Sequence, residues 1–357
     1  MSETPTMSGI PTTGEIPGVT ETQLVASLQP VRGFVLASAI QHMFSSGLYD
    51  RLLANPRARV DELARALGFD EERLLALLTF LWHEDIVSID DGAVTLTERA
   101  HEIAGVRAWY EMVIGGYGGT FLQIGECLGE GSGPATRDGA LVASGSCGIS
   151  LHDAIPIVRR LLAEADGEYE TLLDLGCGSG VYLTELTASY PRLRAVGIEP
   201  SQDAVDAARR WVAASESSDR IEVRLADAVP FLEAGSVRPD LVLLCFVIHE
   251  VLGQRGEQGV RALLAALFES NPDADLIVID VDHGWGERSR MEHPLATTYY
   301  NLYFLLHPFT RQRLERIAYW ETLFQSCGLE VVNRLTTDPR LDSTGLEVGW
   351  LLRRIDR

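Results

Sequence analysis

The chain has 357 residues, of which 46% are hydrophobic and 23% charged, and this balance excludes intrinsic disorder or a fibrous repeat over most of its length. Its formal net charge is −21, from 51 acidic and 30 basic residues, and every one of these 30 is arginine. A field of this sign repels phosphate backbones and anionic lipids, so we predict no binding to nucleic acid or to membranes.

Residues 1–20 are rich in Ser, Thr, Pro and Gly, and we predict a disordered tail there. The tail has neither the basic start nor the apolar stretch of an export signal. No apolar run in the chain reaches the about 18 residues that a membrane-spanning helix needs. Five widely separated cysteines without a CxxC pair are typical of reduced thiols, and we predict a cytoplasmic protein.

Residues 21–105 have the pattern of a winged-helix domain that is mostly helical. After apolar residues at helical spacing come a helix, a second helix and a hairpin with an Asp-Gly turn, at residues 60–68, 70–82 and 86–96. DNA-binding regulators share this pattern, so that alternative stays open. The second helix opens with the acids Asp70, Glu71 and Glu72, which favours packing and dimerisation over DNA contact.

Residues 106–150 contain glycine runs that indicate loops, or a helix broken by glycines that lie close to a neighbour, and we expect this connecting segment to contribute to a substrate pocket. Residues 151–357 alternate strand and helix signals, which predicts an α/β fold with a Rossmann-like, doubly wound, seven-stranded sheet. The last two strands are too close in sequence for a crossover helix, so we predict one antiparallel edge strand. The predicted strands are 171–175, 194–198, 221–225, 241–245, 276–281, 330–334 and 347–352.

The strongest local motif is an apolar strand that runs into Gly176, Gly178 and Gly180 and then into a helix. Glycine permits a sharp turn and lets a ligand lie against bare backbone N–H groups at a helix N-terminus. Glu199 ends the next strand, 19 residues after the last glycine, a spacing that suits a carboxylate on ribose hydroxyls. Asp227 ends the third strand at the same sheet edge.

At residues 174–180 the sequence resembles the first motif of the class I S-adenosylmethionine-dependent methyltransferases, and residues 151–357 resemble their whole fold. The resemblance implies S-adenosylmethionine as cofactor, with the glycine turn at its methionine part, Glu199 at the ribose and Asp227 at the adenine. The N-terminal domain resembles the dimerisation domain of small-molecule O-methyltransferases, which implies a homodimer. The expected cofactor-binding residues are Asp174, Gly176, Cys177, Gly178, Gly180, Glu199, Asp227 and Ala228.

A second site is expected after the fourth strand, where His249 is followed by Glu250. In the O-methyltransferase group a His-Asp pair follows this strand and the His is the general base; His249 matches it, whereas Glu250 replaces the Asp. Four of the 8 histidines fall between 249 and 307, and several imidazoles with a carboxylate form a ligand set for a transition metal. The alternative is structural, with His283 in an exposed turn and His307 beside a helix start.

This combination resembles the 2-oxo acid C-methyltransferases of natural-product biosynthesis, which methylate carbon 3 of 2-oxo acids with aromatic, branched-chain or guanidino side chains. The resemblance implies an iron or zinc ion held by His249, Glu250 and His307, with His293 as substitute for His307. A metal chelated by the substrate stabilises the enolate that forms when the C3 proton leaves. Tyr117 and Tyr303 are expected to wall the substrate pocket, although residues at helical spacing are more often plain core.

Three hypotheses follow from the sequence. The first is a metal-assisted 2-oxo acid C-methyltransferase with His249 and Glu250 as catalytic residues. The second is a metal-free O-methyltransferase that uses His249 as base. The third is a winged-helix regulator that binds the cofactor, which the acidic charge and the histidines disfavour.

Overall fold

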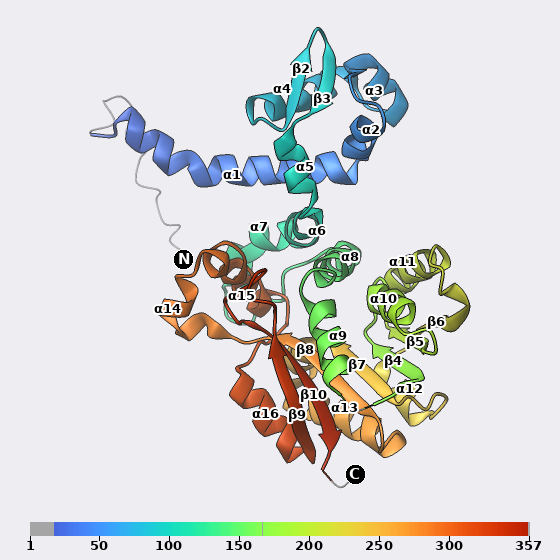
Figure 1. Cartoon of the computed structure of the whole chain (residues 1–357). Coiled ribbons are helices and arrows are strands. Elements are labelled where there is room, and N and C mark those ends of the chain that lie inside the picture. The colour runs from blue at the N-terminus through green and yellow to red at the C-terminus, as the bar shows by residue number, and fades with distance from the viewer. Residues whose placement is uncertain (1–17, 166, 356–357) are drawn as a thin grey trace, which may run out of the picture. The chain divides into compact units, whose positions relative to one another are not determined.

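The computed structural model describes residues 18–165 and 167–355 of the chain (Figure 1). The chain divides into two compact units, Met1–His101 and Glu102–Arg357. Most of the predicted tail, residues 1–17, lies outside the described residues. The observed division falls close to the predicted one at residue 105, and the connecting segment 106–150 belongs to the second unit.

The first unit contains the helices and the hairpin that the winged-helix pattern predicts. Its three short strands form an antiparallel sheet in the order β1-β3-β2. The side chain of Asp70 caps α4 by accepting a 2.9 Å hydrogen bond from the backbone N–H of Arg73, which gives one of the predicted acids a structural role. The elements are α1 (Glu21–Ser45), α2 (Leu48–Ala54), β1 (Ala58–Arg59), α3 (Val60–Leu67), α4 (Glu71–His83), β2 (Val87–Asp90), β3 (Ala93–Leu96) and α5 (Glu98–Ala104), which leads out of the unit.

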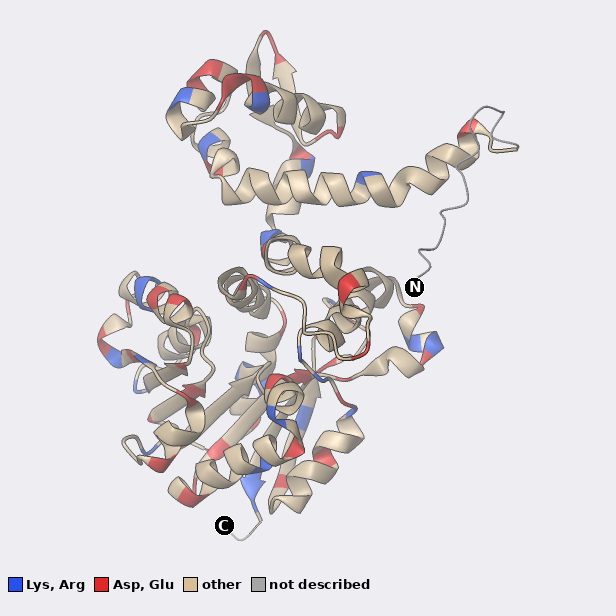
Figure 2. Cartoon of the chain, turned by 180° about the vertical axis from the view of Figure 1, so that it is seen from behind, with Lys and Arg blue, Asp and Glu red and all other residues tan. Residues whose placement is uncertain are grey.

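Helix α1 exposes an unusually apolar surface along its first half. Among the described residues it is the one single helix whose length and composition would allow it to cross a membrane, and α8 with α9 passes that test only as a bent pair. Arg32 on α1 forms a bidentate ion pair with Glu84 of the same unit, at 2.7 and 2.8 Å. Figure 2 shows the helix almost entirely tan, with very few charged residues. Its exposed apolar residues are Leu24, Val25, Leu28, Val31, Phe34 and Val35.

Glycines bring the helices of the connecting segment close together. A Cβ atom on Gly145 of α8 would lie 2.5 Å from the backbone nitrogen of Met112, and one on Gly116 would lie 2.6 Å from a methyl group of Val142. A larger residue at either position would therefore separate α8 from the π-helix against which it packs. The segment comprises α6 (Arg107–Tyr110), a π-helix (Glu111–Gly116), α7 (Gly118–Cys127) and α8 (Gly139–Ser150).

The second unit is built on a seven-stranded sheet, as predicted, and its strand order is β6-β5-β4-β7-β8-β10-β9. Alternate residues of each strand point to opposite faces and bury two separate cores. Helices α9 (Ala154–Glu164), α10 (Val181–Ser189) and α11 (Gln202–Ala213) cover one face, whereas α12 (Ala228–Glu233), α13 (Ile248–Ser270) and α16 (Ile317–Ser326) cover the other. The strands are β4 (Thr171–Leu175), β5 (Arg194–Glu199), β6 (Ile221–Leu225), β7 (Leu241–Cys245), β8 (Asp275–Val281), β9 (Leu329–Thr336) and β10 (Glu347–Arg354).

The direction of β10 determines which residues reach the functional edge of the sheet. β10 is antiparallel to both β8 and β9, so the reversed strand lies one position in from the edge and β9 forms the edge itself. In this register Glu347, the first residue of β10, pairs with Val281, the last residue of β8. The beginning of β10 therefore lies at the carboxyl ends of the parallel strands.

A 3-10 turn (Ser218–Arg220) precedes β6, and the remaining helical elements of the second unit lie between β8 and α16. They contribute His307 and several tyrosines to the site described below. They are a 3-10 turn (Gly284–Gly286), α14 (Arg288–Met291), a π-helix (Ala296–Tyr300) and α15 (Asn301–Phe309).

Candidate active site

A cavity of about 430 Å³ opens at the carboxyl ends of the parallel strands. This is the edge at which open α/β sheets bind their ligands. Six of the eight residues predicted to bind the cofactor line it, and the other two, Asp174 and Gly180, do not. The six are Gly176, Cys177, Gly178, Glu199, Asp227 and Ala228.

The glycine turn after β4 presents bare backbone to this cavity. Gly176 and Gly178 have φ angles of 83° and 52°, in the left-handed region that favours glycine. The N–H of Gly178 donates a 3.2 Å hydrogen bond to Oε2 of Glu199, and Oε1 of the same carboxylate accepts one from the N–H of Ser201. The predicted acid at the end of β5 therefore lies beside the predicted turn.

Asp174 is enclosed behind the turn. It is 1% exposed, and its Oδ2 has no hydrogen-bond partner among the described residues. Burial, together with the negative charge of Glu199, raises the pKa of Asp174 to about 7. Gly180 caps the start of α10, where a Cβ would lie 3.4 Å from the Cβ of Ala208, so its role in the apoprotein is helix packing.

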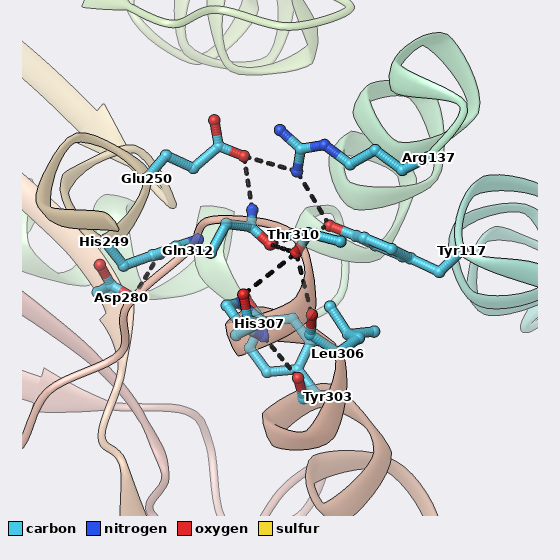
Figure 3. A network of polar contacts seen from close by, with 10 residues as sticks. All are labelled: Tyr117, Arg137, His249, Glu250, Asp280, Tyr303, Leu306, His307, Thr310 and Gln312. Carbon is cyan, nitrogen blue, oxygen red and sulfur yellow. Dashed lines mark hydrogen bonds and ion pairs between the residues drawn. The ribbon is translucent and has the colours of Figure 1, made fainter. Parts of the chain in front are cut away.

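His249 and His307 lie together, with ring centroids 5.1 Å apart (Figure 3). Neither lines the cavity itself, but Glu250, the residue after His249, does. Nδ1 of His249 is 2.9 Å from Oδ1 of Asp280, and Nδ1 of His307 donates to the backbone oxygen of Tyr303 at 2.5 Å. Both acceptors hold a proton on Nδ1, so in the neutral form of each ring Nε2 carries the lone pair. Nε2 of His307 is buried without a hydrogen-bond partner among the described residues.

The two imidazoles have opposite electrostatic surroundings. Burial lowers the pKa of His307 well below its ordinary value, and the neighbouring His249 adds to this effect. At His249 burial also opposes the charged form, but the carboxylate of Asp280 outweighs it and the pKa is raised. His307 is therefore a neutral imidazole with a free Nε2, which is the form that ligates metals.

Glu250 is turned toward Arg137 and away from the two imidazoles. Its Oε1 accepts hydrogen bonds from Arg137 at 2.8 Å and from Gln312 at 2.6 Å. Burial opposes ionisation of this carboxyl, but Arg137 outweighs burial and lowers the pKa of Glu250. Arg137 also donates to the hydroxyl of Tyr117 at 3.2 Å, so the network in Figure 3 joins the connecting segment to α13.

The predicted metal ligands are only partly assembled. Across residues 18–165 and 167–355, no three side chains of His, Cys, Asp or Glu are arranged to hold a metal ion. His249 and His307 are together, with Glu250 nearby but paired with Arg137. His293, the substitute ligand, is outside the group, where its Nε2 lies 3.0 Å from the hydroxyl of Ser343.

Sequence reasoning missed three members of this network. Asp280 lies near the end of β8, so the sheet-edge argument that selected Glu199 would also have selected it. Arg137 and Gln312 lie in segments with no helix or strand pattern and gave no signal. Tyr117 and Tyr303, predicted at the substrate pocket, contact the network through Arg137 and His307.

Comparison with known proteins identifies the family. Residues 173–270 match the family described as a methyltransferase domain. Over 336 residues the chain is 41% identical to the 2-ketoarginine methyltransferase of Streptomyces arginensis, an alignment that covers 94% of this chain and 97% of that protein. The chain belongs to the S-adenosylmethionine-dependent methyltransferases.

Solved structures confirm the predicted fold of this methyltransferase over nearly its whole length. Human N-acetylserotonin methyltransferase in complex with S-adenosylmethionine superimposes with a TM-score of 0.64 at 16% identity, covering 95% of this chain and 99% of that one. An O-methyltransferase family protein from Burkholderia thailandensis gives a TM-score of 0.63 at 15% identity, with 94% and 99% covered. The N-terminal helical region and the seven-stranded sheet are therefore both features of the O-methyltransferase fold.

Proposed function

We propose that this methyltransferase transfers the methyl group of S-adenosylmethionine to carbon 3 of a 2-oxo acid. The observation that carries the proposal is the relative at 41% identity, because 2-ketoarginine is itself a 2-oxo acid. The buried, neutral imidazole of His307 beside His249 supports it, since a hydroxyl methyltransferase needs one base rather than two imidazoles.

In this proposal S-adenosylmethionine occupies the 430 Å³ cavity over the glycine turn. The backbone of Gly176 and Gly178 lies against the methionine part and Glu199 holds the ribose hydroxyls, while Asp227 lies at the adenine. Asp174, behind the turn, is a carboxyl without a partner on Oδ2, which suits the ammonium group of the methionine part.

Replacing Gly178 with valine is expected to reduce the affinity for S-adenosylmethionine at least about 100-fold. Gly178 has a left-handed φ, and a Cβ there would lie 3.1 Å from Sγ of Cys147, on the wall of the cavity. Calorimetry measures the affinity. Gly286→Val is the matched control, because Gly286 is exposed and a Cβ there meets nothing within 4 Å. Equal affinity of the two variants for S-adenosylmethionine would contradict the proposal that the cofactor binds at the glycine turn.

The residues of the second group fit a transition metal in part. Each imidazole has its Nδ1 fixed by an oxygen and its Nε2 left open, which is the arrangement that orients metal-ligating histidines. We propose that His249 and His307 hold an iron or zinc ion with Glu250 as third ligand. When bound, such an ion supplies Lewis-acid polarisation of a 2-oxo group.

Arg137 has a separate role in the proposal. Among the described residues, two arginines line the cavity, Arg137 and Arg255. Of the two, Arg137 is the one paired with Glu250. Its guanidinium binds the carboxylate of the 2-oxo acid, which orients carbon 3 toward the cofactor. Tyr117 and Gln312 hold the Arg137–Glu250 pair in place from either side.

The second candidate function is O-methylation of a small molecule with His249 as base. The His249–Asp280 hydrogen bond favours it, because a carboxylate on Nδ1 orients an imidazole to accept a proton at Nε2. An assay with labelled S-adenosylmethionine against a panel of 2-oxo acids and phenols separates the candidates. Label in the 2-oxo acids supports the C-methyltransferase; label only in the phenols would replace it with the second candidate.

We also propose that the enzyme is a homodimer through its first unit. The apolar residues of α1 are about half exposed, Leu28 at 49% and Val31 at 59%, and a surface of this kind on a lone protomer favours association. Light scattering is expected to report twice the mass of one chain. Leu28→Glu with Val31→Glu is expected to give a monomer, whereas the control Leu341→Glu, at an exposed loop residue, is expected to leave the dimer intact; a monomeric parent protein would contradict the proposal.

The reaction is proposed to take place in the cytoplasm. All five cysteines have free thiols, three of them buried, which suits a reducing compartment. The small-molecule substrate is the only partner proposed besides the second subunit, without nucleic acid or membrane. Fractionation of cells that produce the protein tests the location.

A further inference from the structure

A second, smaller cavity of about 20 Å³ lies next to the cofactor cavity. Ser146 and Phe246 line both cavities, so they form the partition between them. Tyr303 lines the second cavity, and its ring lies 4.2 Å, centroid to centroid, from the ring of His307. The second cavity therefore lies directly beyond the place proposed for the reacting end of the substrate.

Two carboxyl groups line this cavity without a cation to balance them. Asp153 is 8% exposed and Glu347 is 3% exposed, and Oε1 of Glu347 has no hydrogen-bond partner among the described residues. None of the described residues that line the cavity is an arginine or a histidine. Burial raises the pKa of Asp153 to about 7, although hydrogen bonds with the Ala154 N–H and with Glu347 oppose the rise. Burial, together with the neighbouring Asp153, raises the pKa of Glu347 well above its ordinary value.

Structural roles account for Asp153 and for a neighbouring acid, whereas Glu347 shares a hydrogen bond with Asp153 through one oxygen and leaves Oε1 without a partner among the described residues. Asp153 caps α9 by accepting a 2.6 Å hydrogen bond from the N–H of Ala154. Asp342 accepts hydrogen bonds from the hydroxyl of Tyr300 at 2.6 Å and from the N–H of Thr344 at 2.8 Å. A buried carboxyl that lacks such bonds destabilises the fold unless a ligand completes it.

The cavity wall also suits a cation. Tyr299, Tyr300 and Tyr303 form a cluster of rings around it, with centroids 5.1 Å apart for the first two and 5.8 Å for Tyr299 and Tyr303. Aromatic faces attract cations, and a guanidinium group in particular combines stacking on rings with paired hydrogen bonds to carboxylates.

We propose that Asp153 and Glu347 bind a cationic group, a guanidinium, at the far end of the 2-oxo acid. This inference rests on the proposed function, which places the reacting end of the substrate beside His307. As it stands the cavity has room for about one water molecule, so the tyrosine rings must move apart to admit the guanidinium. The two acids then determine which 2-oxo acids are substrates.

The test uses two ligands of nearly equal shape and different charge. Calorimetry with the parent enzyme and S-adenosylhomocysteine compares 5-guanidino-2-oxopentanoate, a cation at its far end, with 5-ureido-2-oxopentanoate, which is neutral there. The parent is expected to bind the guanidino acid about 100-fold more tightly, and Glu347→Gln is expected to abolish this preference. Glu330→Gln, at an exposed residue of β9, is the matched control and is expected to keep it.

Asp153→Asn provides a second variant, because asparagine preserves the helix cap while it removes the charge. Loss of the guanidino preference in either variant, with unchanged affinity for S-adenosylhomocysteine, supports the cation site whether or not methyl transfer is observed. Equal binding of the two acids by the parent, or a preference that survives both substitutions, overturns the site. If the cation site is overturned but the enzyme methylates the neutral 4-methyl-2-oxopentanoate, the proposed function still holds. Failure of the cation site is thereby distinguished from failure of the proposed function.

Discussion

Replacing His307 with alanine is expected to lower turnover by a factor on the order of 1000 and to remove the metal from the purified enzyme, while S-adenosylmethionine still binds. His307 contributes a neutral imidazole whose Nε2 has no hydrogen-bond partner in the part of the chain that the structure describes, so its proposed role lies in the metal site. His249→Ala is expected to have the same effects. The cofactor site is spared because its residues follow β4, β5 and β6, whereas the imidazoles belong to α13 and α15.

The O-methyltransferase alternative predicts a different result for the same variants. A hydroxyl methyltransferase with His249 as base would lose activity in His249→Ala, retain most of it in His307→Ala and be insensitive to chelators. His293→Ala is the matched control, because that histidine lies outside the group and its Nε2 is next to Ser343. Elemental analysis and turnover before and after chelation decide the question, and a metal-free parent with full activity would contradict the proposed metal site.

Replacing Arg137 with methionine is expected to reduce kcat/KM for the 2-oxo acid about 100-fold and to lower the free energy of unfolding by about 2 kcal/mol. Glu250 would lose its cation and keep only the hydrogen bond from Gln312. The side chains of Arg137 and Glu250 are 24% and 31% exposed, so solvent screens part of the loss and the expected effect is smaller than for a fully buried pair.

Arg288→Met is the matched control for this prediction. Arg288 pairs with Glu292 on the surface at 93% exposure, and its loss is expected to change the free energy of unfolding by less than about 0.5 kcal/mol. Urea denaturation measures both variants. The double variant Arg137→Met with Glu250→Gln tests the effect on stability alone. The free energy of unfolding is expected to recover because no charge remains unpaired, whereas kcat/KM is read only in the single variant because Glu250 is also a proposed metal ligand.

The sheet was predictable because each of its central strands is a short apolar run bounded by turn residues. β4, β6 and β7 have the predicted bounds. β4 and β7 are buried parallel strands, apolar on nearly every residue, whereas the edge strand β6 alternates apolar and charged residues. The same rule placed Glu199 and Asp227 at one edge. The pair of imidazoles was expected only from the family resemblance, because no spacing rule connects His249 with a histidine 58 residues later in the chain.

The connecting segment and the last strand could not be interpreted in the same way. Residues 106–150 have a high glycine content that obscures helical periodicity, and their helices form because glycine permits close packing of α8 on its neighbour. Arg137 contributes its charge from an irregular stretch, where sequence patterns carry no information on position. Asp153 and Glu347 lie 194 residues apart, and they meet only because β10 inserts between β8 and β9.

The reversed direction of β10 has a consequence for how this enzyme could diversify. A parallel strand at that position would point its last residue at the active-site edge, but β10 presents its first residue, Glu347, next to the loop before it. Exchange of that loop and of residue 347 between relatives would alter the accepted side chain of the substrate without touching β4 to β6, where the methyl donor is proposed to bind. We therefore expect that exchanging residues 337–347 between enzymes of this fold transfers the substrate range. The affinity for S-adenosylmethionine is expected to stay that of the enzyme that receives the segment.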